Sequence, residues 1–153
     1  MIFKDNIYGA CLEIDDTIID SISSICLESY PNESGGFLVG RYSDDNCTAI
    51  VSSVIIPTSY SSTPVSYERD TNGMEPMWDH LYEDGLIYLG EWHSHPNGNA
   101  SYSCTDKQAL TNIANSKSVR ITSPIMLIFG FSMTKIKQIR AYYFKDGKIV
   151  DYE

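Results

Sequence analysis

The sequence has few basic residues. Its 153 residues include 11 Lys and Arg against 20 Asp and Glu, and the formal net charge is −9. General binders of nucleic acid or of anionic membranes need a basic face. We therefore expect no nucleic-acid partner and no membrane partner, and a protein partner with a basic surface fits this charge better.

Long apolar runs are also missing. No segment approaches the roughly 18 apolar residues of a membrane-spanning helix. The first residues, Met1 to Asp5, lack the apolar stretch of a signal peptide. These absences lead us to expect a cytoplasmic protein.

Cysteine pairs are absent as well. The four cysteines stand singly and form no CxxC motif: Cys11, Cys26, Cys47 and Cys104. Spacing of this kind in a cytoplasmic chain favours reduced thiols. We expect them to pack as small hydrophobic side chains.

What is present indicates one folded unit. With 42% hydrophobic residues, the sequence is long enough for one core and too short for two comfortable ones. It contains no internal repeats and no low-complexity segments. We therefore expect a single domain over residues 1–153.

Hydrophobic periodicity predicts mixed secondary structure. Apolar spacing of three and four predicts helices over residues 16–30, over residues 74–82 and after Asp106. Strands are predicted at 7–14, 37–40, 47–56, 65–69, from after Gly85 to Pro96, 125–131, 136–144 and 149–152, with an exposed loop at 57–64. This order indicates an α/β or α+β domain with a mixed sheet between helices.

The segment around two histidines has the strongest chemical pattern. His93 and His95 stand two residues apart at the end of a predicted strand, so their side chains project from one face. Pro96 ends the strand, and Ser103-x-x-Asp106 resembles a helix start that brings the Asp106 carboxylate within reach. Two imidazoles and one carboxylate would leave one position open on a tetrahedral metal, as in catalytic zinc sites.

A hydrolytic metal site also needs a base that is not a metal ligand. Glu33 is the candidate because it stands at a helix-to-strand junction, and the following Gly35-Gly36 would permit close approach of backbone or substrate. Spacing alone does not single it out. Six other glutamates compete with it: Glu13, Glu28, Glu68, Glu75, Glu83 and Glu91.

Simpler roles exist for several of these residues. Ser103 and Asp106 could form a helix capping box, which is compatible with a ligand role for Asp106. Glu91 could orient a ligand or could be an ordinary solvated carboxylate. Trp92 and Ser94 are expected to pack on the opposite face of the strand, His80 to lie at the surface, and Cys104 to point away from the metal.

Two segments resemble a known family. Residues 33–40, Glu-Ser-Gly-Gly-Phe-Leu-Val-Gly, resemble the E-x-x-G-x-L-x-G pattern of the JAMM (MPN+) metalloproteases. His93-x-His95-Pro96, followed by six residues, Ser103, two residues and Asp106, matches their H-x-H-P-x6-S-x2-D signature. The resemblance implies an MPN/JAB-like domain of the stand-alone prokaryotic type, a curved mixed sheet flanked by helices with layering similar to that of cytidine deaminases.

The resemblance also implies the site and the reaction. His93, His95 and Asp106 would bind one Zn²⁺ per chain, Glu33 would be the general acid/base, and Ser103 would help to hold the oxyanion. The implied substrate is an amide, typically the isopeptide bond after the C-terminal glycine of a ubiquitin-like modifier. Some stand-alone relatives belong to bacterial ubiquitin-like conjugation or anti-phage defence operons.

Three functions are compatible with this resemblance. The chain could be a deconjugating isopeptidase, a peptidase that trims the tail of a ubiquitin-like or sulfur-carrier protein, or a non-catalytic MPN scaffold. The scaffold is disfavoured because no motif residue has been lost. A zinc nucleobase deaminase is excluded because its H-x-E and C-x-x-C pattern is absent. The sequence leaves the modifier, its target, any activating partner and the oligomeric state open. The segments 57–64 and 97–102 are expected to contact substrate.

Overall fold

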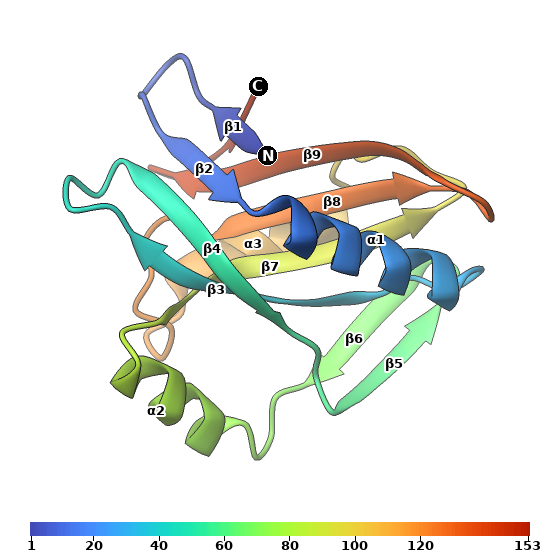
Figure 1. Ribbon diagram of the computed structural model, residues 1–153, viewed down its shortest axis with the longest axis horizontal. Coiled ribbons are helices and arrows are strands. Elements are labelled where there is room, and N and C mark those ends of the chain that lie inside the picture. Colours follow the sequence, from blue (N-terminus) through green and yellow to red (C-terminus); the bar gives the residue numbers. More distant parts are fainter.

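A curved sheet of eight strands forms the centre of the protein (Figure 1). The computed structural model describes residues 1–153. The strands lie in the order β1-β2-β4-β3-β7-β8-β9-β10. Their bounds are β1 Ile2–Lys4, β2 Cys11–Ile14, β3 Gly35–Tyr42, β4 Thr48–Ile55, β7 Ile87–Pro96, β8 Ile125–Phe131, β9 Ile136–Lys145 and β10 Lys148–Asp151. The sheet is mixed: β2–β4 and β7–β8 run parallel, and the other neighbours run antiparallel.

Three helices and a separate hairpin complete the fold. The helices are α1 Asp16–Ser29, α2 Glu75–Glu83 and α3 Cys104–Asn115, and the hairpin joins β5 Ser59–Thr63 to β6 Ser66–Asp70. Figure 1 shows α1 in front of the sheet, α3 behind it, and the two termini close together. None of the helices has the length and apolar character that crossing a membrane requires. The expected mixed α+β architecture is therefore confirmed.

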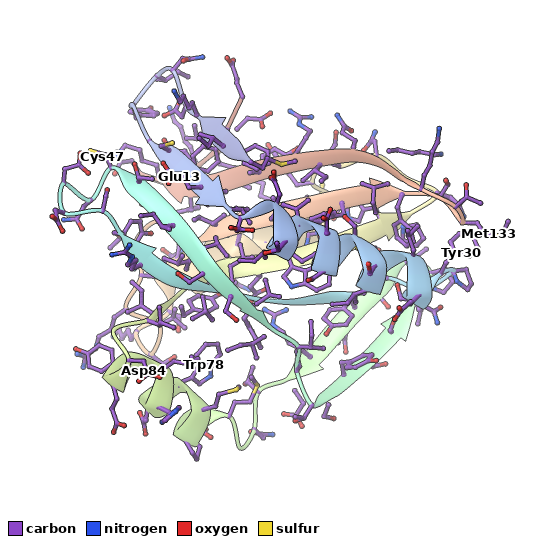
Figure 2. All side chains as sticks on the ribbon, viewed as in Figure 1. Glu13, Tyr30, Cys47, Trp78, Asp84 and Met133 are labelled. Carbon is purple, nitrogen blue, oxygen red and sulfur yellow. The ribbon has the colours of Figure 1, made fainter.

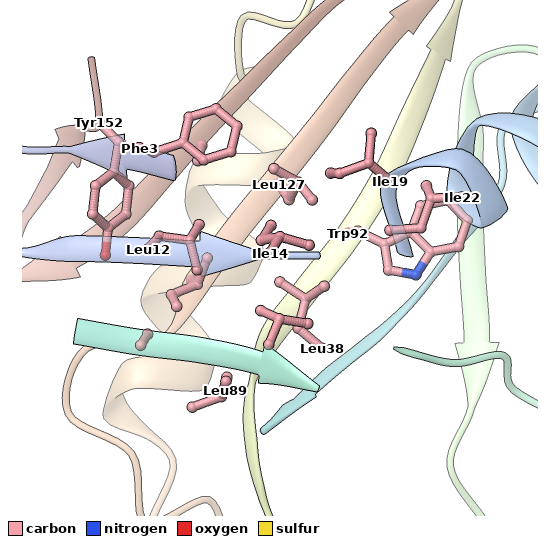
Figure 3. Close-up of a cluster of buried hydrophobic side chains, with 14 of the residues drawn as sticks. Phe3, Leu12, Ile14, Ile19, Ile22, Leu38, Leu89, Trp92, Leu127 and Tyr152 are labelled. Carbon is pink, nitrogen blue, oxygen red and sulfur yellow. The ribbon is translucent and has the colours of Figure 1, made fainter. Parts of the chain in front are cut away.

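The larger core lies between α1 and the sheet. Ile19 and Ile22 of α1 face the fully buried Trp92 of β7, as Figure 3 shows. α1 begins at Asp16 because the Asp15 side chain accepts a hydrogen bond from the Thr17 backbone N–H, an N-cap that satisfies a free donor of the first turn. All seven residues of β8 are buried, as expected for a central strand covered on both faces.

The opposite face of the sheet carries α3 and α2. Leu110 anchors α3 in a second core that includes Met126, Ile128 and Tyr142. Trp78 of α2 packs edge-on against Phe37, and Figure 2 shows Trp78 on the side of α2 that faces the sheet. This is the face on which the histidines of β7 project.

Two predictions of secondary structure were wrong, one of a strand and one of a loop. Instead of one strand over residues 7–14, the chain forms β1, a turn and β2. The Asp5 carboxylate accepts hydrogen bonds from the backbone N–H groups of Ile7 and Tyr8, which closes the turn and leaves both side chains exposed. The predicted loop at 57–64 contains β5, whose Ser- and Thr-rich sequence hides its pairing with β6.

The prediction for the cysteines was correct in part. All four are free, but only Cys26 is buried, and Cys47 and Cys104 are exposed. The inward face expected for the second helix is also weaker than predicted, because no residue of α2 is fully buried and Tyr82 is exposed.

Candidate metal centre

Alternation along β7 sets the direction of each side chain near the motif. His93 and His95 are partly exposed on the α3 side of the sheet, with 16% and 18% of their side chains accessible. Trp92 and Ser94 are buried on the α1 side, as expected. The Nε2 atoms of the two histidines lie 3.1 Å apart, so both rings point at the same place.

The first turn of α3 brings the carboxylate to this pair. Asp106 Oδ1 lies 3.1 Å from His93 Nε2, and Asp106 Oδ2 lies 3.4 Å from His95 Nε2. Ser103 is the N-cap of α3: its Oγ accepts from the Asp106 N–H, while its own N–H donates to Asp106 Oδ2 at 2.7 Å. The capping box therefore fixes the carboxylate that faces the histidines.

The spacing of these atoms fits a tetrahedral metal. Zinc bonds to nitrogen and oxygen of about 2.0–2.1 Å at tetrahedral angles place neighbouring ligand atoms about 3.3 Å apart. The two Nε2 atoms lie 3.1 Å apart, and each lies 3.1 or 3.4 Å from the carboxylate oxygen of Asp106 that faces it, Oδ1 for His93 and Oδ2 for His95. His93, His95 and Asp106 are the trio whose donor atoms lie close enough together to bind one metal ion.

A hydrogen bond behind the ring determines how His95 can act. His95 Nδ1 lies 3.0 Å from the carbonyl oxygen of Asn99. Because a carbonyl only accepts, Nδ1 must carry the proton, and Nε2 is left with a lone pair toward the cluster. The turn at Asn97 and Gly98 places this carbonyl there.

The charges of the cluster are coupled. Burial acts to raise the pKa of Asp106, but hydrogen bonds from His93 and His95 outweigh burial, so its pKa lies far below the usual range. Asp106 in turn raises the pKa of His95, against the opposing effect of burial. Without a metal the carboxylate thus favours a proton on His95, at a position that a divalent cation would take.

Glu33 lies in the electrostatic field of this cluster. Burial raises the pKa of its carboxyl, His93 and His95 act to lower it, and Asp106 acts to raise it further. β5 holds the backbone of Glu33, because its N–H donates to the Thr63 carbonyl at 2.9 Å and its carbonyl accepts from the Ser62 hydroxyl. The Glu33 backbone is therefore held, its carboxyl lies within electrostatic reach of the trio, and Glu33 is not one of the converging ligands.

Other candidates lie outside the cluster. Glu91 takes neither predicted role, because its carboxylate pairs with Arg69 and accepts from the Tyr88 hydroxyl at 3.2 Å. Cys104 is exposed and does not join the trio. His80 lies at the surface of α2, as expected.

Sequence reasoning missed two supports of the site. It treated residues 57–64 as a loop, whereas Ser62 and Thr63 of β5 hold the Glu33 backbone. It also assigned Ser94 to packing alone, whereas the Ser94 hydroxyl accepts from the Ser34 N–H at 2.9 Å. The sequence gives one hint of the contact between Ser94 and Ser34, which is the position of Ser94 between two candidate metal ligands.

Comparison with known proteins shows a family match and two related sequences. The family described as prokaryotic homologues of the JAB domain matches residues 16–143. A protein of Enterobacter hormaechei named CD-NTase/cGAS isopeptidase is 35% identical over 118 residues, which cover 76% of this chain and 66% of that protein, just under two thirds of its length. A probable metalloprotease of Sinorhizobium fredii is 26% identical over 119 residues, covering 75% of this chain and 73% of the relative.

Solved structures share the fold. A solution structure of a Desulfitobacterium hafniense protein has a TM-score of 0.67 at 20% identity and covers 92% of this chain and 88% of its own. A Salinibacter ruber protein has a TM-score of 0.62 at 21% identity with the same coverage. Together with the family match over residues 16–143, these likenesses agree with the fold described above. The chain belongs to the family of prokaryotic homologues of the JAB domain.

Proposed function

We propose that this protein is a zinc-dependent isopeptidase that hydrolyses the amide bond after the C-terminal glycine of a ubiquitin-like modifier. The observation that carries the proposal is the convergence of His93, His95 and Asp106 at tetrahedral ligand spacing, with Glu33 held beside them. The proposed metal is one Zn²⁺ per chain, because two imidazoles and a carboxylate are a ligand set of catalytic zinc.

The residues around the metal have separate roles in this proposal. Bound to the trio, zinc would supply a Lewis acid that polarises the scissile carbonyl and lowers the pKa of water. Glu33 accepts the proton of the attacking water and delivers it to the leaving amine. The Ser103 hydroxyl accepts the Asp106 N–H and keeps its own proton, so it can donate to the developing oxyanion.

The nature of the substrate is supported by similarity. The Enterobacter hormaechei relative is named an isopeptidase, which favours a protein conjugate as substrate over a free peptide. We propose that the chain acts in a bacterial ubiquitin-like conjugation or defence system in the cytoplasm. The second candidate, trimming of a modifier precursor, uses the same site and differs only in the group attached to the terminal glycine.

One experiment separates these functions. The zinc-loaded protein is incubated with a ubiquitin-like protein that ends in glycine, once linked through that glycine to a lysine side chain and once fused to a linear C-terminal tail. We expect chelator-sensitive cleavage of the lysine conjugate. Preferential cleavage of the linear fusion would favour trimming, and cleavage of neither by zinc-loaded protein would favour a scaffold.

His95→Ala and Asp106→Ala are the matched variants for this experiment. Each removes one of three ligands, so we expect loss of bound zinc together with loss of cleavage. A variant that cleaves at the wild-type rate without bound metal would rule out the proposed chemistry.

A further inference from the structure

The strand that carries Glu33 and the strand that carries the histidines meet at two buried serines. Ser34 is 7% exposed and Ser94 is fully buried. Ser34 directly follows Glu33, and Ser94 stands between His93 and His95. Their hydroxyl oxygens lie 3.0 Å apart.

This contact continues the pairing of β3 with β7 beyond its last regular step. The antiparallel register pairs Gly35 with His93, so Ser34 and Ser94 are the next residues in line. A regular pair would form two backbone hydrogen bonds here, and one of them is present: the Ser94 N–H donates to the Ser34 carbonyl at 2.9 Å. The second is absent, because the Ser34 N–H donates to Ser94 Oγ at 2.9 Å and not to the Ser94 carbonyl. The Ser94 hydroxyl thus replaces the backbone carbonyl as acceptor at the point where the pairing of β3 with β7 ends, next to Glu33.

The replacement completes the fixation of Glu33. Its own N–H and carbonyl are bonded to Thr63 and Ser62 of β5. The N–H of the next peptide is bonded to Ser94. Both peptide groups that flank the Glu33 Cα are therefore held, and this sets the direction in which its side chain leaves the backbone.

We propose that Ser94 is a positioning residue that holds Glu33 in register with the metal ligands, through its hydrogen bond from the Ser34 N–H. The inference rests on the proposed function, because it assigns Glu33 the role of the base. Ser94 acts from the face of the sheet opposite the metal, so it contacts neither the metal nor the substrate.

The two serines predict unequal effects. Ser94→Ala removes the acceptor of the Ser34 N–H, so the peptide after Glu33 is free to move. A misplacement of about 1 Å can cost about 10²-fold in rate. We expect kcat to fall 10- to 10²-fold, with KM within about threefold of wild type and one zinc per chain retained. Ser34→Ala keeps the N–H donor and should leave kcat within about threefold.

Two further variants control for packing. Ser94→Thr keeps the hydroxyl and should restore most of the kcat lost in Ser94→Ala. Cys26→Ala changes the fully buried third member of the group, whose Sγ lies 3.8 Å from Ser34 Oγ, and leaves the Ser34–Ser94 bond intact. It should change thermal stability without changing kcat. Equal loss of kcat in Cys26→Ala and Ser94→Ala would overturn the proposal in favour of a general packing effect.

Amide hydrogen exchange tests the contact without any substrate. In wild type the Ser34 N–H should be protected, and in Ser94→Ala its exchange should accelerate at least 10-fold while the Leu38 amide inside β3 stays protected. Unchanged exchange, or unchanged kcat with only a lower melting temperature, would overturn the proposal. If zinc-loaded wild type cleaves no conjugate, the proposed function fails, and the exchange result still decides whether Ser94 holds this peptide.

Discussion

At the scale of single residues, the tautomer of His95 decides what the imidazole pair can do. The Asn99 carbonyl fixes the proton on Nδ1, and Asp106 faces Nε2. A proton and a metal therefore compete for the same lone pair. In the metal-free protein, binding of this proton beside Asp106 makes stability sensitive to pH.

The sign of this sensitivity depends on the pKa of His95. Asp106 raises the folded-state pKa above the usual 6.5 of an unfolded histidine. The protonated His95–Asp106 pair thus stabilises the metal-free protein fully below about pH 6.5, and this stabilisation is lost as pH rises through the raised pKa. We expect the melting temperature of chelated wild type, measured relative to His95→Gln, to fall between pH 6 and pH 9. A constant difference over that range would contradict the assigned coupling.

Glu33 gives the second prediction at this scale. Glu33→Gln keeps the shape of the side chain but cannot accept a proton. We expect it to bind one zinc per chain and to lose 10²- to 10⁴-fold in kcat. Metal analysis and single-turnover cleavage measured on the same sample provide the test, and wild-type turnover in Glu33→Gln would remove Glu33 from the mechanism.

At the scale of the elements, the site depends on how closely β3 approaches its neighbours. Gly36 is the glycine of the E-x-x-G pattern, and a Cβ there would lie 2.5 Å from the Ile55 carbonyl oxygen and 2.7 Å from Trp92 Nε1. Gly36 thus allows the close backbone approach expected from the sequence, and the neighbours that approach it are β4 and Trp92.

Gly36→Ala tests this packing. Overpacking in a well-packed core costs typically about 1–3 kcal/mol, so we expect a loss of that size in the free energy of unfolding. The shift of β3 should also lower activity. Urea unfolding measures the loss, with Ser53→Ala on the exposed part of β4 as the control, expected within about 0.5 kcal/mol of wild type. Equal stability of both variants would contradict the close packing at Gly36.

The elements differ in how far the sequence could predict them. β7 and the start of α3 were predictable, because period-two alternation and a capping box are local signals. β5 was not, since five Ser, Thr and Tyr residues resemble a loop until β6 pairs with them. The Ser34–Ser94 bond joins residues 60 positions apart, and no local pattern encodes such a contact.

At the scale of the whole molecule, the proposed metal joins β7 of the central sheet to α3 on its surface. Apart from its first turn, α3 is held mainly through Leu110 and its neighbours in the smaller core. A ligand that binds only the folded state stabilises it by about 2.7 kcal/mol at a free concentration 100 times its Kd.

We therefore expect zinc to raise the melting temperature by roughly 5–10 °C over the chelated protein, given about 2–4 °C per kcal/mol for a chain of this size. Scanning calorimetry with and without chelator measures the shift. His95→Ala should show little of it. A shift of equal size in His95→Ala would place the bound zinc elsewhere.

At this scale, the resemblance of two sequence motifs to a known family was enough to predict the family and much of the fold. The motif pattern implied the JAB-type sheet and helices, and the family match over residues 16–143 bears this out. The assignment of residues 1–153 to a single metalloprotease domain stays a prediction. The identity of the proposed modifier would depend on the surfaces of two proteins, so the metal motif does not encode it.

The most direct test is a crystal structure of the zinc-loaded protein with anomalous data collected at the zinc absorption edge. We predict one strong peak within about 2.0–2.2 Å of His93 Nε2, His95 Nε2 and an Asp106 carboxylate oxygen, with the Glu33 carboxylate within hydrogen-bonding distance of the open position. A peak coordinated by Glu33 itself or by Cys104, or no peak at the trio, would contradict the proposed site.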